Sequence, residues 1–327
     1  MSSPLNPASG PPLVPPIRSE DSRTARPDST TERPPTAPVE HPGDGLVVRG
    51  EVGGPVEGAP VVLLHGGGQT RYSWHHTAGV LALGGWRVHN LDLRGHGDSD
   101  WSPTADYSLE GFAADVRSVA AAIAARHPRG LRPALVGASL GGIASLAAIG
   151  ESDADLAVAL VLVDVAPRIE PSGANRIGAF MMEHMEVGFA SLDEVADAIA
   201  AYNPHRPRPS NLDGLRKNLR HRDDGRWYWH WDPAFITGRR STVDETRSLT
   251  DPDRLVRAAR AIAARELPTL LVRGRQSDLL SEEGAREYLE LVPHAQFVDV
   301  AGAGHMVAGD RNDLFNDAVV AFLATSA

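Results

Sequence analysis

The stretch VGASLGG, residues Val136–Gly142, decides the fold because it places a serine between glycines where two structural patterns meet. The apolar run Pro133–Ala138 predicts a buried strand, and Leu140–Gly150 has the apolar spacing of a helix. A sharp turn between a strand and a helix needs small neighbours, and it pushes the serine hydroxyl out at the edge of the sheet. We therefore interpret Ser139 as a candidate nucleophile. The alternative is a serine that caps the N-terminus of the helix.

A serine hydroxyl attacks a carbonyl only when a base takes its proton, and a carboxylate orients that base. For this kind of turn the expected chain order is serine, acid, histidine. His305, in the small-residue loop VAGAGHM after the last predicted strand, is the candidate base. For the acid we favour Asp278, after the strand predicted at Thr269–Arg273, over Asp164, at the end of the run AVALVLVD. Either aspartate could instead cap a helix or form a salt bridge in a loop.

An oxyanion that forms at the carbonyl needs two backbone N–H groups aimed at it. We expect one from Leu140, directly after the candidate nucleophile, and the other from Gly67, after the strand predicted at Ala59–Leu64. The glycines on either side of Gly67 let this loop bend freely, and His65 is interpreted as a hydrogen-bonding residue of the turn. A triple glycine can also bind phosphate, but the lysine of a phosphate-binding loop is missing, and no metal-ligand spacing occurs. The sequence therefore predicts neither a cofactor nor a metal ion.

Strand and helix patterns alternate from residue 45 to 167 and again from 268 to 327. Further strands are predicted at Leu46–Val52, Arg87–Leu93 and Gln296–Val300, and further helices at Arg71–Leu83, Leu109–Arg126, Glu282–Leu291 and Asn312–Leu323. This alternation predicts an α/β fold with a mostly parallel, doubly wound sheet covered by helices on both faces. From residue 168 to 267 the alternation stops. That stretch is rich in arginine and aromatic residues and shows no clear strands, which predicts an inserted helical cap.

Residues 1–44 differ in composition from the rest of the chain. They hold 11 of the 25 prolines and few large apolar residues. Such a segment cannot bury enough apolar surface to offset the entropy of ordering it. We therefore expect a disordered, proline-rich tail.

The composition of the 327 residues argues against several classes of protein for this chain. The net charge of −10 argues against a protein that mainly binds nucleic acid. The chain has no run long and apolar enough to span a membrane, and its start lacks the features of a secretory signal. Cysteine is absent, so disulfides and thiolate chemistry are excluded. These features predict a cytoplasmic protein with a small-molecule partner, and they leave the oligomeric state open.

Five stretches, taken together and in this order, resemble the α/β-hydrolase superfamily: VVLLHGGG, DLRGHGDS, VGASLGG, RGRQSDLL and AGAGHM. The resemblance covers residues 45–165 and 268–327, and it implies that the insertion is the cap domain of that fold. It also implies a structural role for the loop DLRGHGDS, residues Asp92–Ser99. The chain is most similar to the capped branch of epoxide hydrolases, dehalogenases and cofactor-free haloperoxidases. Epoxide hydrolases and haloalkane dehalogenases carry an aspartate where this chain has Ser139.

A serine in that place forms an acyl-enzyme, which suits esters, lactones or thioesters. We therefore expect Ser139 to attack a carbonyl, His305 to act as general base and then as acid, and water to release the product. Two alternative hypotheses use the same residues. The protein could be a cofactor-free perhydrolase or haloperoxidase, or it could hydrolyse carbon–carbon bonds. A ligand-binding protein without activity is the alternative from another class.

The cap contains the aromatic stretch RWYWHWDPAF, Arg226–Phe235. Its tryptophans either pack the cap against the core or form a wall for an apolar or aromatic acyl group. We expect Trp229 to contact the substrate. Trp74 and Met306, which flank the predicted site in the sequence, are the other candidate substrate-binding residues.

Overall fold

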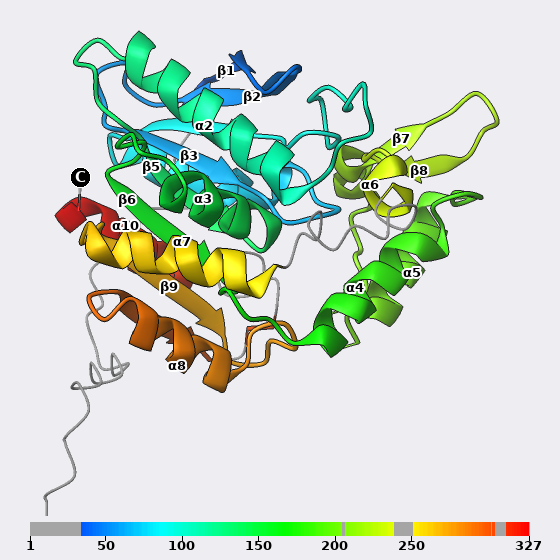
Figure 1. Ribbon diagram of the computed structural model, residues 1–327. Coiled ribbons are helices and arrows are strands. Elements are labelled where there is room, and N and C mark those ends of the chain that lie inside the picture. The colour runs from blue at the N-terminus through cyan, green and yellow to red at the C-terminus, as the bar shows by residue number, and fades with distance from the viewer. Residues whose placement is uncertain (1–33, 205–206, 239–250, 302, 305–311, 327) are drawn as a thin grey trace, which may run out of the picture. The chain divides into compact units, whose positions relative to one another are not determined.

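The structure, a computed structural model, describes residues 34–204, 207–238, 251–301, 303–304 and 312–326. In this part of the chain eight strands form one mostly parallel sheet (Figure 1). In spatial order the strands are β1 (Thr36–Pro42), β2 (Val47–Gly53), β4 (Arg87–Leu91), β3 (Pro60–Leu64), β5 (Ala134–Ala138), β6 (Ala159–Val163), β9 (Thr269–Gly274) and β10 (Gln296–Val300). The pairs β1–β2 and β2–β4 are antiparallel and the other pairs are parallel. The prediction of an α/β fold with a mostly parallel, doubly wound sheet is confirmed.

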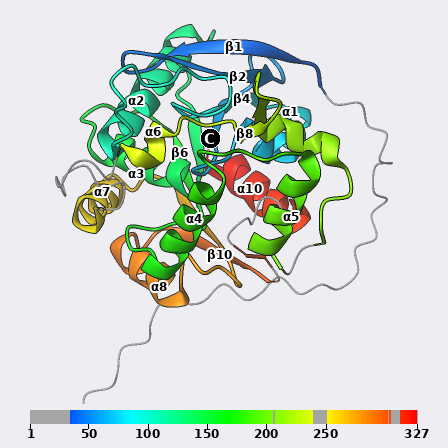
Figure 2. The ribbon, with the colours of Figure 1, turned by 90° about the vertical axis from the view of Figure 1, so that its right-hand side faces the viewer.

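Helices cover both faces of the sheet, as the buried strands require. Every residue of β3, β6 and β9 is buried, which a parallel sheet achieves only between two helical layers. The helices are α1 (His75–Leu83), α2 (Leu109–Arg126), α3 (Leu140–Gly150), α7 (Pro252–Ala264), α8 (Glu282–Leu291) and α10 (Asn312–Ser326), with a short 3-10 helix η1 (Arg71–Trp74) before α1. Figure 2 shows α2, α3, α7 and α8 on one side of the sheet and α1 and α10 on the other. Of the helices that the structure describes, none has the length and apolar character to cross a membrane.

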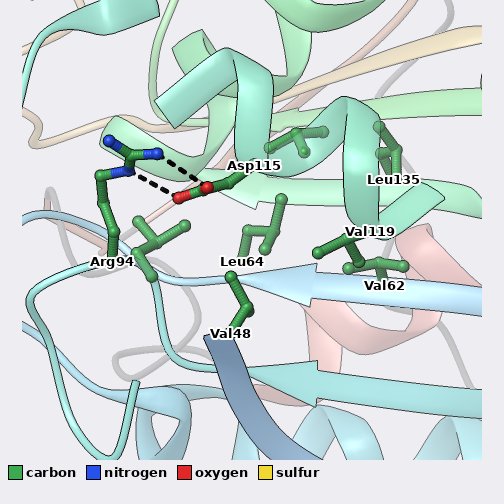
Figure 3. A pocket seen from close by; sticks show the side chains of 9 residues that line it. Val48, Val62, Leu64, Arg94, Asp115, Val119 and Leu135 are labelled. Carbon is green, nitrogen blue, oxygen red and sulfur yellow. Dashed lines mark hydrogen bonds and ion pairs between the residues drawn. The ribbon is translucent and has the colours of Figure 1, made fainter. Parts of the chain in front are cut away.

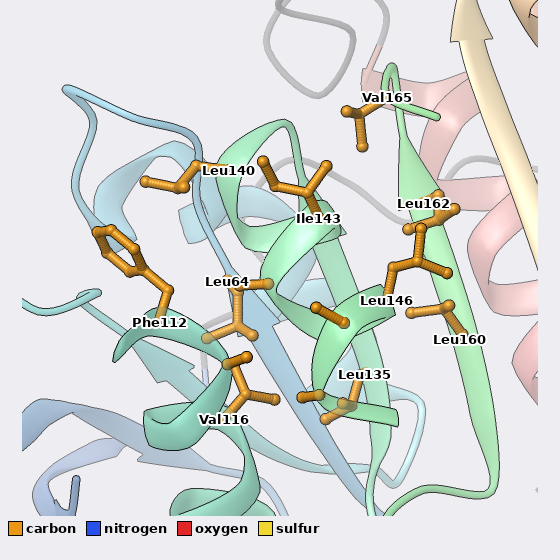
Figure 4. Close-up of a cluster of buried hydrophobic side chains, with 14 of the residues drawn as sticks. Leu64, Phe112, Val116, Leu135, Leu140, Ile143, Leu146, Leu160, Leu162 and Val165 are labelled. Atoms are coloured by element: carbon orange, nitrogen blue, oxygen red, sulfur yellow. The ribbon is translucent and has the colours of Figure 1, made fainter. Parts of the chain in front are cut away.

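The larger part of the core lies between the sheet and the layer of α2, α3, α7 and α8. Figure 4 shows leucines of β3, β5 and β6 that meet Phe112 and Val116 of α2 and Leu146 of α3. The helix α3 is apolar on all sides and buried from its first residue almost to its last, which holds the turn before it rigidly against the sheet. The smaller part of the core lies under α1 and α10.

A small void remains between the sheet and α2, beside the buried ion pair of Arg94 and Asp115 (Figure 3). The Arg94 Nε and Nη2 atoms lie 2.6 and 2.8 Å from the two carboxylate oxygens of Asp115. The void measures about 10 Å³, which is room for one water molecule at most. It is therefore a packing defect beside a structural ion pair and cannot hold a substrate.

The structure corrects one end of the expected tail. Residues 36–42 fall within the segment 1–44 that we expected to be disordered, but they form β1 and pair in register with β2 from Thr36–Gly53 to Pro42–Val47. The backbone of Asp44 is also tied to the core, because its N–H donates to Asp115 Oδ1 at 2.7 Å. The proline content of this segment concealed a strand that pairs with β2 at the edge of the sheet.

The insertion after β6 contains a cap of helices and a hairpin. Its elements are α4 (Pro171–Glu183), α5 (Leu192–Tyr202), η2 (Leu212–Asn218), β7 (Leu219–His221), β8 (Trp227–Trp229) and α6 (Ala234–Thr237). The hairpin β7–β8 differs from the expectation of a stretch without strands. The helix α7, which we expected in the cap, packs on α3 so closely that a Cβ atom on Gly150 would lie 2.5 Å from Ala258. That helix therefore belongs to the core layer.

Candidate active site

Ser139 lies in the turn between β5 and α3, at the carboxyl edge of the sheet. Its backbone has φ 46° and ψ −112°, a conformation that residues other than glycine rarely adopt. The turn is held from both sides, because Ser139 N donates to Val163 O at 3.1 Å and Ile143 N donates to Ser139 O at 3.0 Å. Within the described residues the Ser139 side chain makes no capping hydrogen bond to the helix. The capping alternative is therefore not supported. No capping hydrogen bond within the described residues offsets the strained backbone of Ser139.

The glycines around Ser139 are required by close backbone contacts. A Cβ atom on Gly137 would lie 2.5 Å from the backbone of Gly141, and one on Gly141 would lie 2.5 Å from the carbonyl oxygen of Leu64. Both obstacles are main-chain atoms that cannot rotate away. The G-x-S-x-G pattern is thus explained by the packing of β5, α3 and β3.

The loop after β3 passes beside the candidate nucleophile. A Cβ atom on Gly66 would lie 3.3 Å from Ser139 Cβ. Gly66 N donates to Gln69 Oε1 at 3.2 Å, and Gly68 N donates to His96 Nε2 at 3.0 Å. In the part of the chain that the structure describes, the N–H between them, that of Gly67, has no acceptor.

The second expected donor lies against this loop. Leu140 is the first residue of α3, and within the described residues its N–H has no acceptor either. A Cβ atom on Gly67 would lie 3.7 Å from Leu140 Cδ2. The loop of Gly67 and the start of α3 therefore lie against each other beside Ser139, and among the described residues neither N–H has an acceptor.

Two buried histidines hold the loop, and the hydrogen bonds define their protonation. His65 Nε2 accepts from Leu93 N at 3.0 Å, so its proton lies on Nδ1, which donates to Gly66 O at 2.7 Å. Burial lowers the pKa of His65 to about 4, which keeps the ring neutral. This arrangement agrees with the structural role expected for His65.

His96 was not singled out by the sequence, although it lies in the resembling loop DLRGHGDS. Its Nε2 accepts from Gly68 N, so Nδ1 carries the proton and donates to Arg94 O at 2.9 Å. Its backbone also forms an isolated β-bridge with Trp231 of the cap. His96 thus connects the loop after β3 to the cap, a relation between distant segments that only the fold reveals.

The two candidate acids lie in different surroundings. Asp164 directly follows β6, is fully buried, and accepts hydrogen bonds from Gly274 N at 3.0 Å and Ser277 Oγ at 2.5 Å. Asp278 has a side chain that is 37% exposed, and it accepts from Arg176 Nη1 of the cap at 2.7 Å. The candidate base, His305, lies outside the described residues, as does Met306.

Side chains of the cap close over the oxyanion loop. A Cβ atom on Gly68 would lie 2.9 Å from Met181 Cε, and one on Gly67 would lie 3.3 Å from Phe235 Cζ. Met181 belongs to α4 and Phe235 to α6, and both are buried. The cap therefore presents apolar atoms next to the backbone that we expect to bind the oxyanion.

Trp229 and Trp74, two of the candidate substrate-binding residues, lie in different parts of the structure. Trp229 of β8 lies between the rings of Phe180 and Phe189, at centroid distances of 5.6 and 5.0 Å, and is partly buried. Trp74 is fully buried in the core under α1 and α10, with its ring 5.8 Å from that of Phe315. The structure therefore gives Trp74 a packing role in the core under α1 and α10, on the face of the sheet opposite α3.

Comparisons with known proteins agree with this geometry. A family model described as the alpha/beta hydrolase family matches residues 61–318. Esterase Rv0045c of Mycobacterium tuberculosis is 29% identical over 256 residues, which cover 77% of this chain and 78% of that protein. The 3-hydroxybutyrate-oligomer hydrolase of Cupriavidus necator is 28% identical over 261 residues, 78% of this chain and 85% of that protein. A solved structure of the Mycobacterium tuberculosis esterase has a TM-score of 0.68 at 27% identity and covers 90% of this chain and 93% of its own. This chain therefore belongs to the alpha/beta hydrolase family.

Proposed function

We propose that this protein hydrolyses a carboxylic ester, lactone or thioester of a small substrate through an acyl-enzyme on Ser139. The observation that carries the proposal is the strained turn at Ser139 beside the N–H groups of Gly67 and Leu140, which have no acceptor in the described part of the chain. Strain of this kind persists where a function requires it. Similarity to an esterase and to an oligomer hydrolase supports hydrolysis of an ester bond.

In the proposed reaction Ser139 Oγ attacks the carbonyl carbon while His305 accepts the hydroxyl proton. The carbonyl oxygen becomes an oxyanion, which the N–H groups of Gly67 and Leu140 hold. The tetrahedral intermediate expels the alcohol or thiol, which takes the proton from His305, and leaves an acyl group on Ser139. Water, deprotonated by His305, then attacks the acyl carbon, and the acid product leaves as the proton returns to Ser139. A carboxylate orients His305; the sequence favours Asp278 for this role, with Asp164 as the alternative.

The cap supports a substrate with an apolar or aromatic acyl group. Met181 and Phe235 place apolar atoms against Gly68 and Gly67. The thioether chain of a methionine adapts to different shapes, so this part of the site can accept more than one acyl group. Trp229, with its ring among other aromatic side chains, is proposed as part of the same apolar wall.

The proposal is tested by labelling with a fluorophosphonate probe, which reacts with activated serines. We expect the wild-type protein to be labelled at Ser139 and the Ser139→Ala variant not to be labelled. A panel of esters, lactones and thioesters, with and without hydrogen peroxide, then identifies the acyl acceptor and the substrate class. Labelling that persists in Ser139→Ala, or a folded wild-type protein that neither reacts with the probe nor turns over any substrate, would contradict the proposal.

A further inference from the structure

The strand register places Asp164 next to the candidate nucleophile. Ala138 of β5 pairs with Val163 of β6, and this is the last pair of the two parallel strands. Ser139 and Asp164 are therefore the first residues beyond the paired strands, on neighbours about 4.8 Å apart in a sheet. Asp278 follows the end of β9 by four residues, and β6 lies between β9 and β5.

The backbone is in the left-handed region at both positions. Ser139 has φ 46° and Asp164 has φ 54°, and within the described residues only two other residues besides glycine, Ala105 and Glu266, have positive φ. Strained conformations cluster where the surrounding structure needs a side chain in an unusual direction. Two such residues at the ends of adjacent strands indicate that the side chains of Ser139 and Asp164 are directed by the same site.

Two hydrogen bonds hold the carboxylate of Asp164. Oδ1 accepts from Gly274 N, and Oδ2 accepts from Ser277 Oγ. These two bonds orient the group, and a carboxylate, with about four acceptor positions, can accept hydrogen bonds from three donors at once. Full burial strengthens any such bond, because water does not compete for it.

Asp278 has a different partner. Its Oδ2 lies 2.7 Å from Arg176 Nη1 on α4, and the same guanidinium donates to the carbonyl oxygen of Tyr202 at the end of α5 and lies 4.8 Å from the centre of the Tyr202 ring. The backbone of Asp278 also packs under α4, because a Cβ atom on Gly173 would lie 2.2 Å from its carbonyl oxygen. Asp278 thus connects the core to two helices of the cap.

We infer that Asp164, rather than Asp278, is the carboxylate that orients the base of this serine hydrolase, and that Asp278 serves to hold the cap through Arg176. The inference rests on the proposed function. It makes Asp164 a positioning residue, which acts on the substrate only through the base. It also replaces the assignment of Asp278 that the sequence alone favours.

The first experiment compares Asp164→Asn with Asp278→Asn, using the best ester of the substrate panel. We expect Asp164→Asn to lower kcat at least about 100-fold with little change in KM, since removal of an orienting aspartate from such a triad costs about 10⁴-fold. Asp278→Asn should keep kcat within about threefold. A graded comparison is Ser277→Ala, which removes one of the two hydrogen bonds that orient Asp164 but leaves its charge, and should lower kcat less than Asp164→Asn does.

The pH profile of kcat/KM distinguishes an orienting role of Asp164 from a purely structural one. A carboxylate beside the base favours its protonated form, so Asp164→Asn should move the acidic limb of the profile to lower pH. Asp278→Asn and Ser277→Ala should leave that limb in place. An unmoved limb in a folded Asp164→Asn protein, or a 100-fold loss of kcat in Asp278→Asn, overturns the inference. The second criterion holds even if Asp164→Asn does not fold.

The role of Asp278 is tested with Arg176→Gln and the double variant. Arg176→Gln also removes the contacts with Tyr202, so it should cost more than Asp278→Asn. If Asp278 acts through Arg176, the double variant should change thermal stability and KM no more than Arg176→Gln alone, because the ion pair is already lost. Additive effects overturn this part of the inference. Failure of the proposed function can be distinguished from failure of this inference. If the proposed function is wrong, Ser139→Ala remains active. If only the inference is wrong, Ser139 is still essential and the roles of the two aspartates are exchanged.

Discussion

Main-chain contacts leave no room for a side chain at the glycines around Ser139, and Gly137 is the clearest case. A Cβ atom there would meet Gly141 and Gly142 backbone atoms at 2.5 Å. Gly137→Ala should therefore lower the free energy of unfolding by about 1–3 kcal/mol, the usual cost of overpacking. It should also reduce turnover, since α3 must shift with Ser139 at its start. Thermal unfolding and ester hydrolysis measure the two effects.

The control for this substitution is Gly178→Ala in α4. A Cβ atom on Gly178 meets nothing within 4 Å, and alanine favours a helix over glycine by about 1 kcal/mol. The control should therefore be neutral or stabilising. If both variants unfold at the wild-type temperature, the turn is more adaptable than the contacts of Gly137 indicate.

For single residues, the sequence indicates which backbone positions lie near Ser139 better than it indicates where their side chains point. The loop of Gly67 lies against Leu140 beside Ser139, as expected, because a motif fixes which backbone positions meet. The role of Gly67 and Leu140 as oxyanion donors stays a prediction. The sequence favoured Asp278 over Asp164 as the orienting carboxylate, although both aspartates follow strands at the same edge of the sheet. It also suggested Trp74 for the site, because nearness in sequence does not show to which face η1 turns a side chain.

Among the structural elements, the segment of the cap after β8 is anchored on the core by one buried carboxylate. Tyr107 Oη donates to Asp232 Oδ2 at 2.5 Å, and Asp232 N donates to Gly95 O at 2.8 Å. The same tyrosine oxygen accepts from Ser102 N at 3.0 Å. Tyr107→Phe leaves both groups without this partner, so it should lower the free energy of unfolding by about 1–3 kcal/mol. Urea denaturation measures the loss.

A matched substitution at the tip of the hairpin provides the control. Tyr228 Oη donates to Asp224 Oδ2 at 2.7 Å, but Asp224 is exposed and water can replace the lost bond. Tyr228→Phe should therefore cost clearly less than Tyr107→Phe. Equal losses would show that burial of the Asp232 carboxylate does not strengthen the anchor.

The helices of the core were predicted better than the elements at its margins. The bounds of α2 and α8 were predicted without error, because Ser108 and Ser281 cap their first turns and mark their starts in the sequence. β1 was missed because its composition resembles that of the preceding tail. The hairpin β7–β8 was missed because strands of three residues are too short to show an alternating pattern.

The stability of the whole molecule should depend on pH through buried histidines. Burial lowers the pKa of His41 to about 4, of His65 to about 4, and of His89 to about 3. In the unfolded chain the ordinary pKa is about 6.5, so below pH 6.5 the unfolded state binds more protons than the folded state. The free energy of unfolding should therefore fall as the pH drops from about 6.5 towards 4, by up to about 1.4 kcal/mol per pH unit for each histidine.

Urea denaturation at pH 7.5, 6 and 5 measures this dependence. His41→Gln should reduce the slope by about one proton. A slope equal to that of the wild-type protein would mean that His41 does not take part.

The amino-terminal strand should contribute to the stability of the whole sheet. Removal of residues 1–44 deletes β1 and leaves β2 as the outer strand, whereas removal of residues 1–33 keeps β1. We expect the first variant to melt at a lower temperature than the second, because it loses the pairing with β2 and the contact of His41 Nε2 with His89 Nδ1 at 3.1 Å. Equal melting temperatures would show that β1 adds nothing to the folded state.

The composition of β1 has a further consequence for protein in concentrated solution. The outer strand of a sheet can recruit a strand from another molecule, which begins aggregation. Two of the seven residues of β1, Pro38 and Pro42, have no N–H to offer an incoming strand, and Glu40 between them adds an exposed charge. The prolines that concealed this strand in the sequence therefore also protect the native protein from edge-to-edge polymerisation.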